Sequence, residues 1–384
     1  MSSKISLQQI TPNKANKLFY IDNLKILLTM LVVVHHTIIV YCAPGGWYYT
    51  EKTTQIAAII PSTIFVSLNQ SFFMGFFFLL AGYFTAPSYH RKGTWKFLGD
   101  RFTRLGIPLL FYSFVLSPLL SYLVYYFAER NHITYLQYLS GYHSWIDFGV
   151  LWFVAALLLF TLIYVGAKRF VTIKFKNPIP APGTAKILFF AVLLGVITFF
   201  VRILFPVGWV LKPFGFQLGH FPQYIILFII GLLAYKNQWF DSLPLKVGKS
   251  LRRVAWLGLI FFPLFFLIKA KLNMPIEWYS GGFHWQSLLY AVWEQCIGIS
   301  ILTALLSVGK NSWNRSSPLL SKLSRCTFAT YIFHPLVITG VSLIFKCWLA
   351  DPAVKFLVLA PFVVMGSFLL GSIVLIIPGV KRII

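Results

Sequence analysis

The chain has 384 residues, of which 58% are hydrophobic and 11% charged, and its mean hydropathy of +0.77 excludes an ordinary soluble domain. A net charge of +24 would suggest nucleic acid in a soluble protein, but here most Lys and Arg lie between long apolar stretches. Such cations orient a membrane protein and meet anionic lipid. We therefore expect a polytopic membrane protein whose partner is the lipid bilayer and not nucleic acid.

The chain begins with a polar, mildly basic segment, and the apolar run after it has no small-residue cleavage site. We expect a cytoplasmic tail at 1–21 and a single integral-membrane domain over 22–384. The first apolar run, DNLKILLTMLVVVHHTIIVY, carries Lys25 at its polar start and His36 eleven residues later. On a helix this separation is roughly 16 Å, which brings His36 near the middle of a bilayer. An ionisable side chain at that depth is costly and is a candidate functional residue.

The hydropathy pattern predicts an all-α fold with about ten transmembrane helices. The even-numbered connections are rich in Lys and Arg and the odd-numbered ones are poor, which predicts that both termini are cytoplasmic. The predicted spans are 23–42, 62–85, 104–127, 148–167, 186–205, 219–236, 251–269, 285–307, 326–346 and 354–377.

Several polar residues lie at matching depth inside these spans. His334 is roughly 13 Å into the ninth span, Glu294 is near the middle of the eighth, and Asn69 and Gln70 are at a similar level in the second. A carboxylate that faces an imidazole provides a base and its orienting group, as proton abstraction requires. We therefore predict that His36, Glu294 and His334 form a catalytic group.

Each of these residues also has a structural interpretation. His35 is expected to satisfy a neighbouring polar group, and His334 precedes a proline whose helix kink frees a carbonyl. Glu294 is also suited to be the counter-ion of a basic group inside the membrane. Asn69 and Gln70 are typical of hydrogen bonds between helices.

The connection before the third span contains a second candidate site. Arg101 and Arg104 are three residues apart, which places both guanidinium groups on one face of a helical turn. Planar guanidinium groups bind phosphate oxygens with two hydrogen bonds, so the pair suits a phosphate-rich ligand at the cytoplasmic edge. The alternative is that both residues only anchor the helix on the inside.

Taken together, these motifs resemble the integral-membrane acyltransferase-3 family over essentially the whole chain. Lys25 and His36 match its first-span motif of Arg or Lys, ten residues and His, and this spacing selects His36 rather than His35. Arg101 and Arg104 match its RxxR signature. Four further segments look like those of the family: FFFLLAGYF at 76–84, LWFVAALLLF at 151–160, FPQYIILFIIGLLAY at 221–235 and ATYIFHPLVI at 329–338.

The resemblance implies a membrane O-acyltransferase that moves an acetyl or succinyl group from cytoplasmic acyl-CoA to a carbohydrate hydroxyl of a cell-envelope or exported glycan. The chain is similar to the short members of the family, which lack an extracytoplasmic hydrolase-like domain. In this interpretation Lys25, Arg101 and Arg104 bind acyl-CoA, which is a donor substrate, and no bound cofactor or metal is expected. His36 is the base, and Glu294 or His334 orients it. Direct transfer and an acyl-histidine intermediate both remain open.

Two other classes of function fit parts of the sequence. A transporter or flippase of a lipid-linked sugar would also have many spans and a polar cluster near the midplane, but we find no Gly/Pro-interrupted pair of halves. A membrane scaffold or sensor would leave the buried histidines and glutamate unexplained. The expected location is the bacterial cytoplasmic membrane, and the sequence makes no prediction of oligomeric state.

Overall fold

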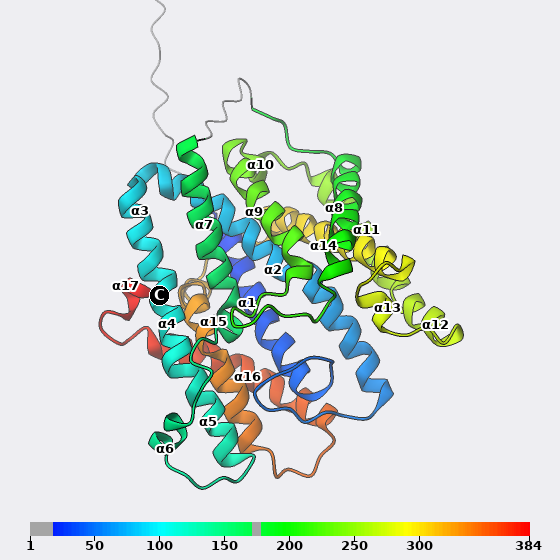
Figure 1. The fold of residues 1–384 in the computed structure, drawn as a ribbon. Helices are drawn as coiled ribbons and strands as arrows, with labels where there is room; N and C mark the ends of the chain where they lie inside the picture. Colours follow the sequence, from blue (N-terminus) through cyan, green and yellow to red (C-terminus); the bar gives the residue numbers. More distant parts are fainter. Residues whose placement is uncertain (1–17, 171–177) are drawn as a thin grey trace, which may run out of the picture.

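The computed structural model describes residues 18–170 and 178–384, so most of the predicted tail at 1–21 lies outside the described residues. The described part is a bundle of helices with no strand beyond one isolated bridge between Leu211 and Phe216 (Figure 1). The longer helices are α1 (Phe19–Tyr41), α2 (Ile56–Lys92), α5 (Ser117–Phe127), α7 (Trp152–Phe170), α8 (Thr184–Leu204), α9 (Phe221–Lys236), α11 (Leu245–Phe261), α14 (Trp285–Ser312), α15 (Pro318–Ile344) and α16 (Pro352–Val374).

Short elements connect or extend these helices. They are α3 (Thr94–Arg101), η1 (Phe102–Gly106), α4 (Ile107–Phe111), η2 (Tyr112–Leu116), α6 (Tyr135–Ser140), η3 (Gly149–Leu151), η4 (Leu218–His220), α10 (Trp239–Ser242), α12 (Pro263–Lys271), α13 (Glu277–Ser280) and α17 (Val380–Ile383).

Ten helical stretches in the described residues are long and apolar enough to cross a membrane, and each overlaps one predicted span. The all-α class and the number of spans are therefore confirmed. The predicted second connection is shorter than expected, because α2 continues to Lys92 and a new helix begins at Thr94. Gly93 separates them with a φ of +71°, a left-handed conformation that favours glycine. The third span then runs from α3 to α5 through the π-helical turns η1 and η2.

The first helix lies inside the bundle. α1 packs against α2, α14, α15 and α16, and its side chains are buried on more than one side, from Leu24 and Leu28 to Val33 and Val40. A helix that is apolar around its circumference and enclosed in this way exposes little of its surface to lipid. This enclosure places the two histidines of α1 within the protein.

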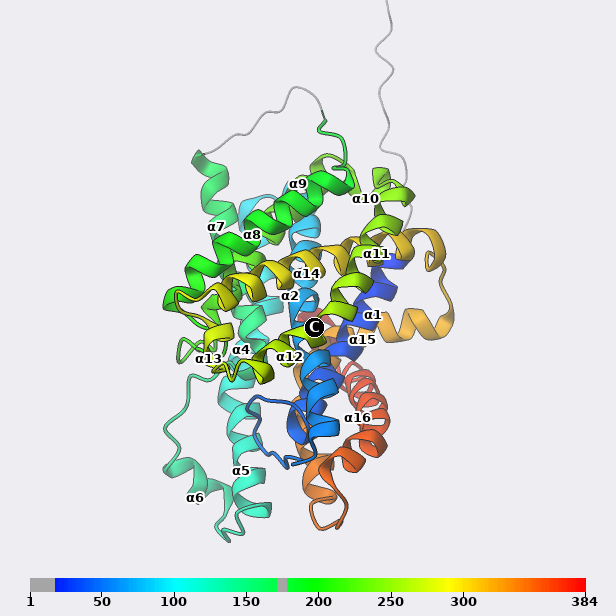
Figure 2. The same cartoon turned by 90° about the vertical axis from the view of Figure 1, so that its right-hand side faces the viewer.

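Small residues allow the other central helices to approach closely. A side chain at Gly82 of α2 would meet the Phe228 carbonyl of α9, and one at Gly231 of α9 would meet the Leu79 carbonyl of α2. Gly298 of α14 lies in the same way against the Ser71 carbonyl of α2. Such contacts between small residues are typical of helix packing in membranes. Figure 2 shows that α14 crosses α2 at a steep angle.

The helices α11 and α12 lie at the periphery of the bundle (Figures 1 and 2). Their exposed apolar side chains include Trp256, Ile260, Phe261 and Leu267. Exposed apolar side chains of this kind are suited to lipid contact. The polar groups considered as a candidate site belong to other elements.

Candidate active site

The structure brings His36 of α1 and His334 of α15 together. Their Nδ1 and Nε2 atoms are 2.9 Å apart, and the rings stack with an interplanar angle of 11°. His334 is fully buried and His36 is partly buried. The prediction that these two residues meet, made from their depths alone, therefore agrees with the geometry.

Hydrogen bonds determine which ring nitrogen of His36 is free. The Nδ1 of His334 lies 2.8 Å from the Tyr331 carbonyl oxygen, which only accepts, so this nitrogen carries the proton. In neutral His334 the Nε2 is then an acceptor, and the Nδ1–H of His36 must donate to it. The Nε2 of His36 consequently keeps its lone pair, as a general base requires.

Pro335 explains why His334 can hold this orientation. A proline inside a helix has no N–H to give to the carbonyl four residues earlier, which in α15 is that of Tyr331. The imidazole of His334 donates to that same oxygen. The two interpretations of His334 are therefore compatible, because the proline frees the carbonyl that fixes the tautomer of the histidine.

The segment between α1 and α2 covers His36. Trp47 in this segment stacks on the His36 ring at a centroid distance of 4.5 Å, and its buried indole N–H has no hydrogen-bond partner among the described residues. Tyr48 shares a 2.9 Å hydrogen bond with Tyr112 of η2. Burial raises the pKa of the Tyr48 hydroxyl, so it stays protonated at neutral pH.

Two polar contacts fasten this covering segment to α16. Glu51 forms an ion pair of 2.5 Å with the buried Lys355, and the Thr53 hydroxyl donates to Asp351 at 2.9 Å. The Lys355 ammonium also donates to the Phe345 carbonyl at the end of α15. The covering segment, 42–55, is thereby held at the start of α16, where Lys355 also contacts the end of α15.

His35 has a different environment from His36. Its Nδ1 lies 3.1 Å from the Asn69 amide nitrogen, and its ring stacks on Phe73 at 5.0 Å. Both partners belong to α2, so His35 connects α1 to its neighbour. This agrees with the structural interpretation of His35 and Asn69.

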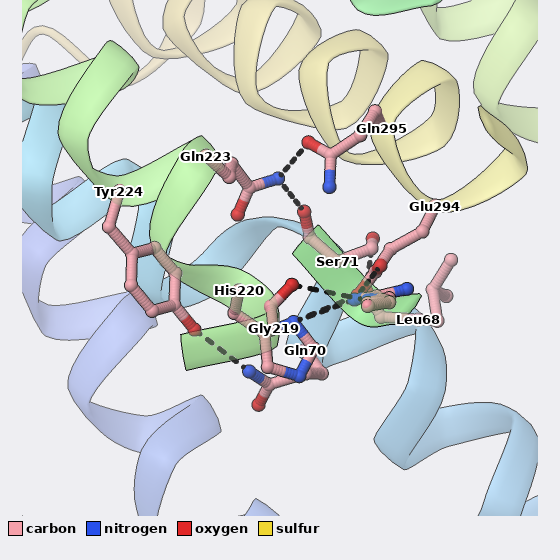
Figure 3. A network of polar contacts seen from close by, with 10 residues as sticks. Leu68, Gln70, Ser71, Gly219, His220, Gln223, Tyr224, Glu294 and Gln295 are labelled. Atoms are coloured by element: carbon pink, nitrogen blue, oxygen red, sulfur yellow. Dashed lines mark hydrogen bonds and ion pairs between the residues drawn. The ribbon is translucent and has the colours of Figure 1, made fainter. Parts of the chain in front are cut away.

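Glu294 contacts other residues than His36. Its carboxylate lies 2.5 Å from Arg202 of α8 and 3.3 Å from His220 at the start of α9, and all three side chains are buried. Figure 3 shows this network, with Gln70 bonded to Tyr224 beside it. Among the described residues, the carboxylate makes no contact with His36. The expectation that Glu294 orients His36 therefore has no support in its contacts, whereas its alternative as counter-ion to a basic group does.

Sequence reasoning missed Arg202 and His220. Arg202 is a cation near the end of the apolar run KILFFAVLLGVITFFVRIL, and no pattern in the sequence pairs it with Glu294. It is fully buried, and its Nη1 has no hydrogen-bond partner among the described residues. The two charges belong together because a buried carboxylate needs a paired cation.

Lys25, Arg101 and Arg104, the predicted phosphate-binding residues, line one cavity of about 270 Å³. Arg101 donates to the Thr85 hydroxyl at 3.5 Å and lies over the Phe97 ring, and Lys25 pairs with Asp22 at 3.4 Å. The remaining walls are mainly apolar side chains of α2, α7 and α15. The structure therefore brings the three cations to the same cavity.

Tyr331 connects this cavity to the histidine pair. Its side chain lines the cavity, its ring centroid is 6.0 Å from that of His334, and its carbonyl accepts the His334 N–H. The hydroxyl of Tyr331 donates to the Val150 carbonyl, which fixes the ring. The cavity thus extends from three cations to a residue in direct contact with His334.

Comparison with known proteins gave one match. A family model described as an acyltransferase domain, Acyl_transf_3, matches residues 18–375. No curated protein and no solved structure matched the chain.

Proposed function

The chain belongs to the integral-membrane acyltransferase-3 family, whose model covers residues 18–375, and on this premise we propose that it transfers acetyl or succinyl from acyl-CoA to a carbohydrate hydroxyl. Membrane acyltransferase activity follows from the family. The CoA donor, the glycan acceptor and the acyl group are the proposal.

The cavity of Lys25, Arg101 and Arg104 is the observation that carries this proposal. A CoA thioester has a highly charged phosphate end and a long neutral arm that ends in the reactive carbonyl. Three cations at an otherwise apolar cavity suit such a molecule, because the guanidinium groups bind phosphate oxygens and the walls accept the arm. Tyr331 lines this cavity and lies beside His334, so a thioester at that end of the cavity would be close to the His36–His334 pair.

The proton transfers follow from the tautomers of the two histidines. The Nε2 of His36 removes the proton from the acceptor hydroxyl, whose oxygen attacks the thioester carbonyl. The resulting imidazolium is stabilised by its Nδ1–H bond to His334. When the tetrahedral intermediate collapses, the C–S bond breaks, the ester forms, and the CoA thiolate takes the proton back from His36.

Trp47 supplies the hydrogen bond that the attacked carbonyl needs. Negative charge develops on the carbonyl oxygen, and a donor aimed at that oxygen lowers the barrier. The indole N–H lies next to His36, is buried, and lacks a partner among the described residues. A free buried donor carries a desolvation cost of about 1–3 kcal/mol, which an accepting oxygen relieves.

The acceptor approaches from the side of the covering segment. Trp47 and Tyr48 offer aromatic faces and a hydroxyl there, as a carbohydrate with apolar faces and polar edges requires. The donor enters from the cytoplasm, where the positive-inside pattern puts Arg101 and Arg104. The bacterial cytoplasmic membrane is the location that this arrangement implies.

The test uses the purified full-length chain in detergent with labelled acetyl-CoA or succinyl-CoA, and it measures free CoA with and without candidate glycans. His36→Ala is expected to lower turnover by roughly 10²–10⁴-fold, because it removes the general base. The matched control is His35→Gln, which changes the adjacent buried histidine but keeps a polar partner for Asn69.

The outcomes separate the classes of function. CoA release that requires both the glycan and His36 supports the transferase. Wild-type turnover of His36→Ala would contradict the role of His36. Glycan flux into liposomes without acyl-CoA, and no CoA release, would favour the transporter.

A further inference from the structure

A second cavity, of about 490 Å³, lies beside the first. Its charged walls are Lys322 and Arg325, near the start of α15, and Lys381 of α17. The apolar part of the lining consists of Leu375, Ile376 and Ile384. The proposed mechanism uses none of these six residues.

The three cations have no acidic partner. Among the described residues, no carboxylate lies within ion-pair distance of Lys322, Arg325 or Lys381, and all three side chains are exposed. Three like charges around one hollow repel each other, and an anion placed between them removes that repulsion. The cavity is therefore suited to a ligand that carries phosphate.

The two cavities share a wall. Ile384 lines both of them, and Ile383 at the end of α17 lines the first. The end of α17 and the following residue therefore separate one cavity from the other. α17 also packs against η1, the turn that carries Arg104. A ligand that extends past this segment would contact Arg104 on one side and Lys381 on the other.

The size of the first cavity shows why a second is needed. Its 270 Å³ is below the range of roughly 300–1,000 Å³ typical of pockets for drug-sized ligands. CoA is larger than such ligands, because a phosphorylated adenosine and a diphosphate precede its pantetheine arm. The first cavity has room for the arm and leaves the nucleotide end outside.

We propose that Lys322, Arg325 and Lys381 bind the nucleotide end of acyl-CoA through its 3′-phosphate, while Lys25, Arg101 and Arg104 contact the diphosphate. The inference rests on the proposed donor. It predicts that the protein distinguishes CoA from dephospho-CoA, which lacks only the 3′-phosphate. An anionic phospholipid presents the same phosphate chemistry at a membrane edge, so the experiment must separate the two sources.

The experiment measures equilibrium binding of CoA and dephospho-CoA to the full-length chain in nanodiscs of zwitterionic lipid. The wild type is expected to bind CoA about tenfold more tightly, the order of a charge-assisted hydrogen bond at a partly exposed site. Lys322→Gln/Lys381→Gln is expected to lose this preference while binding dephospho-CoA as the wild type does. Arg104→Gln is expected to weaken both ligands and keep the preference.

Lys249→Gln is the control for surface charge, because Lys249 is an exposed lysine on α11 outside both cavities. It removes one positive charge and should leave the preference unchanged. If Lys249→Gln reduces the preference as much as the double variant does, general surface charge explains the effect and the inference is wrong.

Other results overturn different parts of the argument. Equal binding of both ligands by the wild type would refute the second site and leave the proposed donor intact. Failure to bind either ligand would refute the donor and the site together. If native mass spectrometry shows that the double variant loses co-purified anionic lipid but keeps its preference for CoA, the cavity is a lipid site.

Discussion

Trp47 combines two properties that one substitution can separate. Its ring stacks on His36, and its buried N–H has no partner among the described residues. Phenylalanine keeps an aromatic face but has no donor. The two contributions therefore have different expected effects on binding and on the chemical step.

We predict that Trp47→Phe lowers kcat roughly 10²-fold and changes the KM for acyl-CoA little, because a donor to the developing oxyanion acts only in the transition state. Steady-state kinetics with acetyl-CoA or succinyl-CoA and the accepted glycan measure both constants. Trp145→Phe, at an exposed tryptophan stacked on Phe114, is the control. An unchanged kcat in Trp47→Phe would show that the indole N–H is not used in the reaction.

The histidine pair was predictable from the sequence, but the role of its neighbours was not. Residue spacing gives depth along a helix, which is why His36 and His334 were expected at one level. The sequence also predicts that Pro335 frees a carbonyl, and the structure shows that this carbonyl, of Tyr331, accepts the His334 N–H. Trp47 was missed because it lies in a connection whose path over His36 is set by contacts distant in sequence, such as Glu51 with Lys355.

For contacts between helices, the Arg202–Glu294 pair shows what the depth of a residue along its helix does not predict. Glu294 was expected at the level of His36, but depth does not say toward which helix a side chain points. The direction depends on the packing of α14 against α2 and α8, where Gly298 meets the Ser71 carbonyl and Gly195 meets Val292. The sequence shows these contacts only as single glycines within apolar runs.

We predict that Glu294→Met alone destabilises the protein, because it leaves the buried Arg202 without its carboxylate. Removing one partner of a buried pair costs about 3–5 kcal/mol, whereas replacing both by apolar residues is often neutral. The double variant Arg202→Met/Glu294→Met should therefore regain the stability that the single variant loses. Thermal unfolding of the purified variants, followed by size-exclusion chromatography, measures this difference.

Turnover of the double variant distinguishes the two interpretations of Glu294. If Glu294 is a counter-ion, a stably folded double variant keeps its acyltransferase activity. A double variant that is as stable as the wild type but inactive would restore Glu294 to the catalytic group. His36→Ala serves as the inactive but folded reference in the same assay.

For the whole molecule, sequence alone predicted the class, the number of spans and a proposed orientation. Apolar length and the alternation of charge in the connections are properties of single segments, so they can be read in order. The lateral arrangement of the helices is not a property of single segments. The central place of α1 and the steep crossing of α14 over α2 depend on which faces fit together (Figures 1 and 2).

The natural cysteines provide a test of orientation without engineered sites. Cys347, between α15 and α16, is the exposed one, while Cys42 and Cys326 are buried and Cys296 is partly buried. With cytoplasmic termini, the connection that contains Cys347 is external. We predict that a membrane-impermeant maleimide labels the chain in right-side-out vesicles and that Cys347→Ser abolishes this labelling. Labelling only in inside-out vesicles would reverse the topology and place the cavity of Arg101 and Arg104 on the external side.

The contacts that hold segment 42–55 to α16 also bear on the membrane as a permeability barrier. In a transferase of the proposed kind, the donor reaches the histidine pair from one side and the acceptor from the other. If both approaches were open at once, water would join the two compartments through the protein and protons would flow down their gradient. The Glu51–Lys355 pair and the Thr53–Asp351 bond hold the segment that stacks Trp47 on His36, on the side from which the acceptor is proposed to approach. In a transferase of the proposed kind, the same contacts would therefore also keep the two compartments separate.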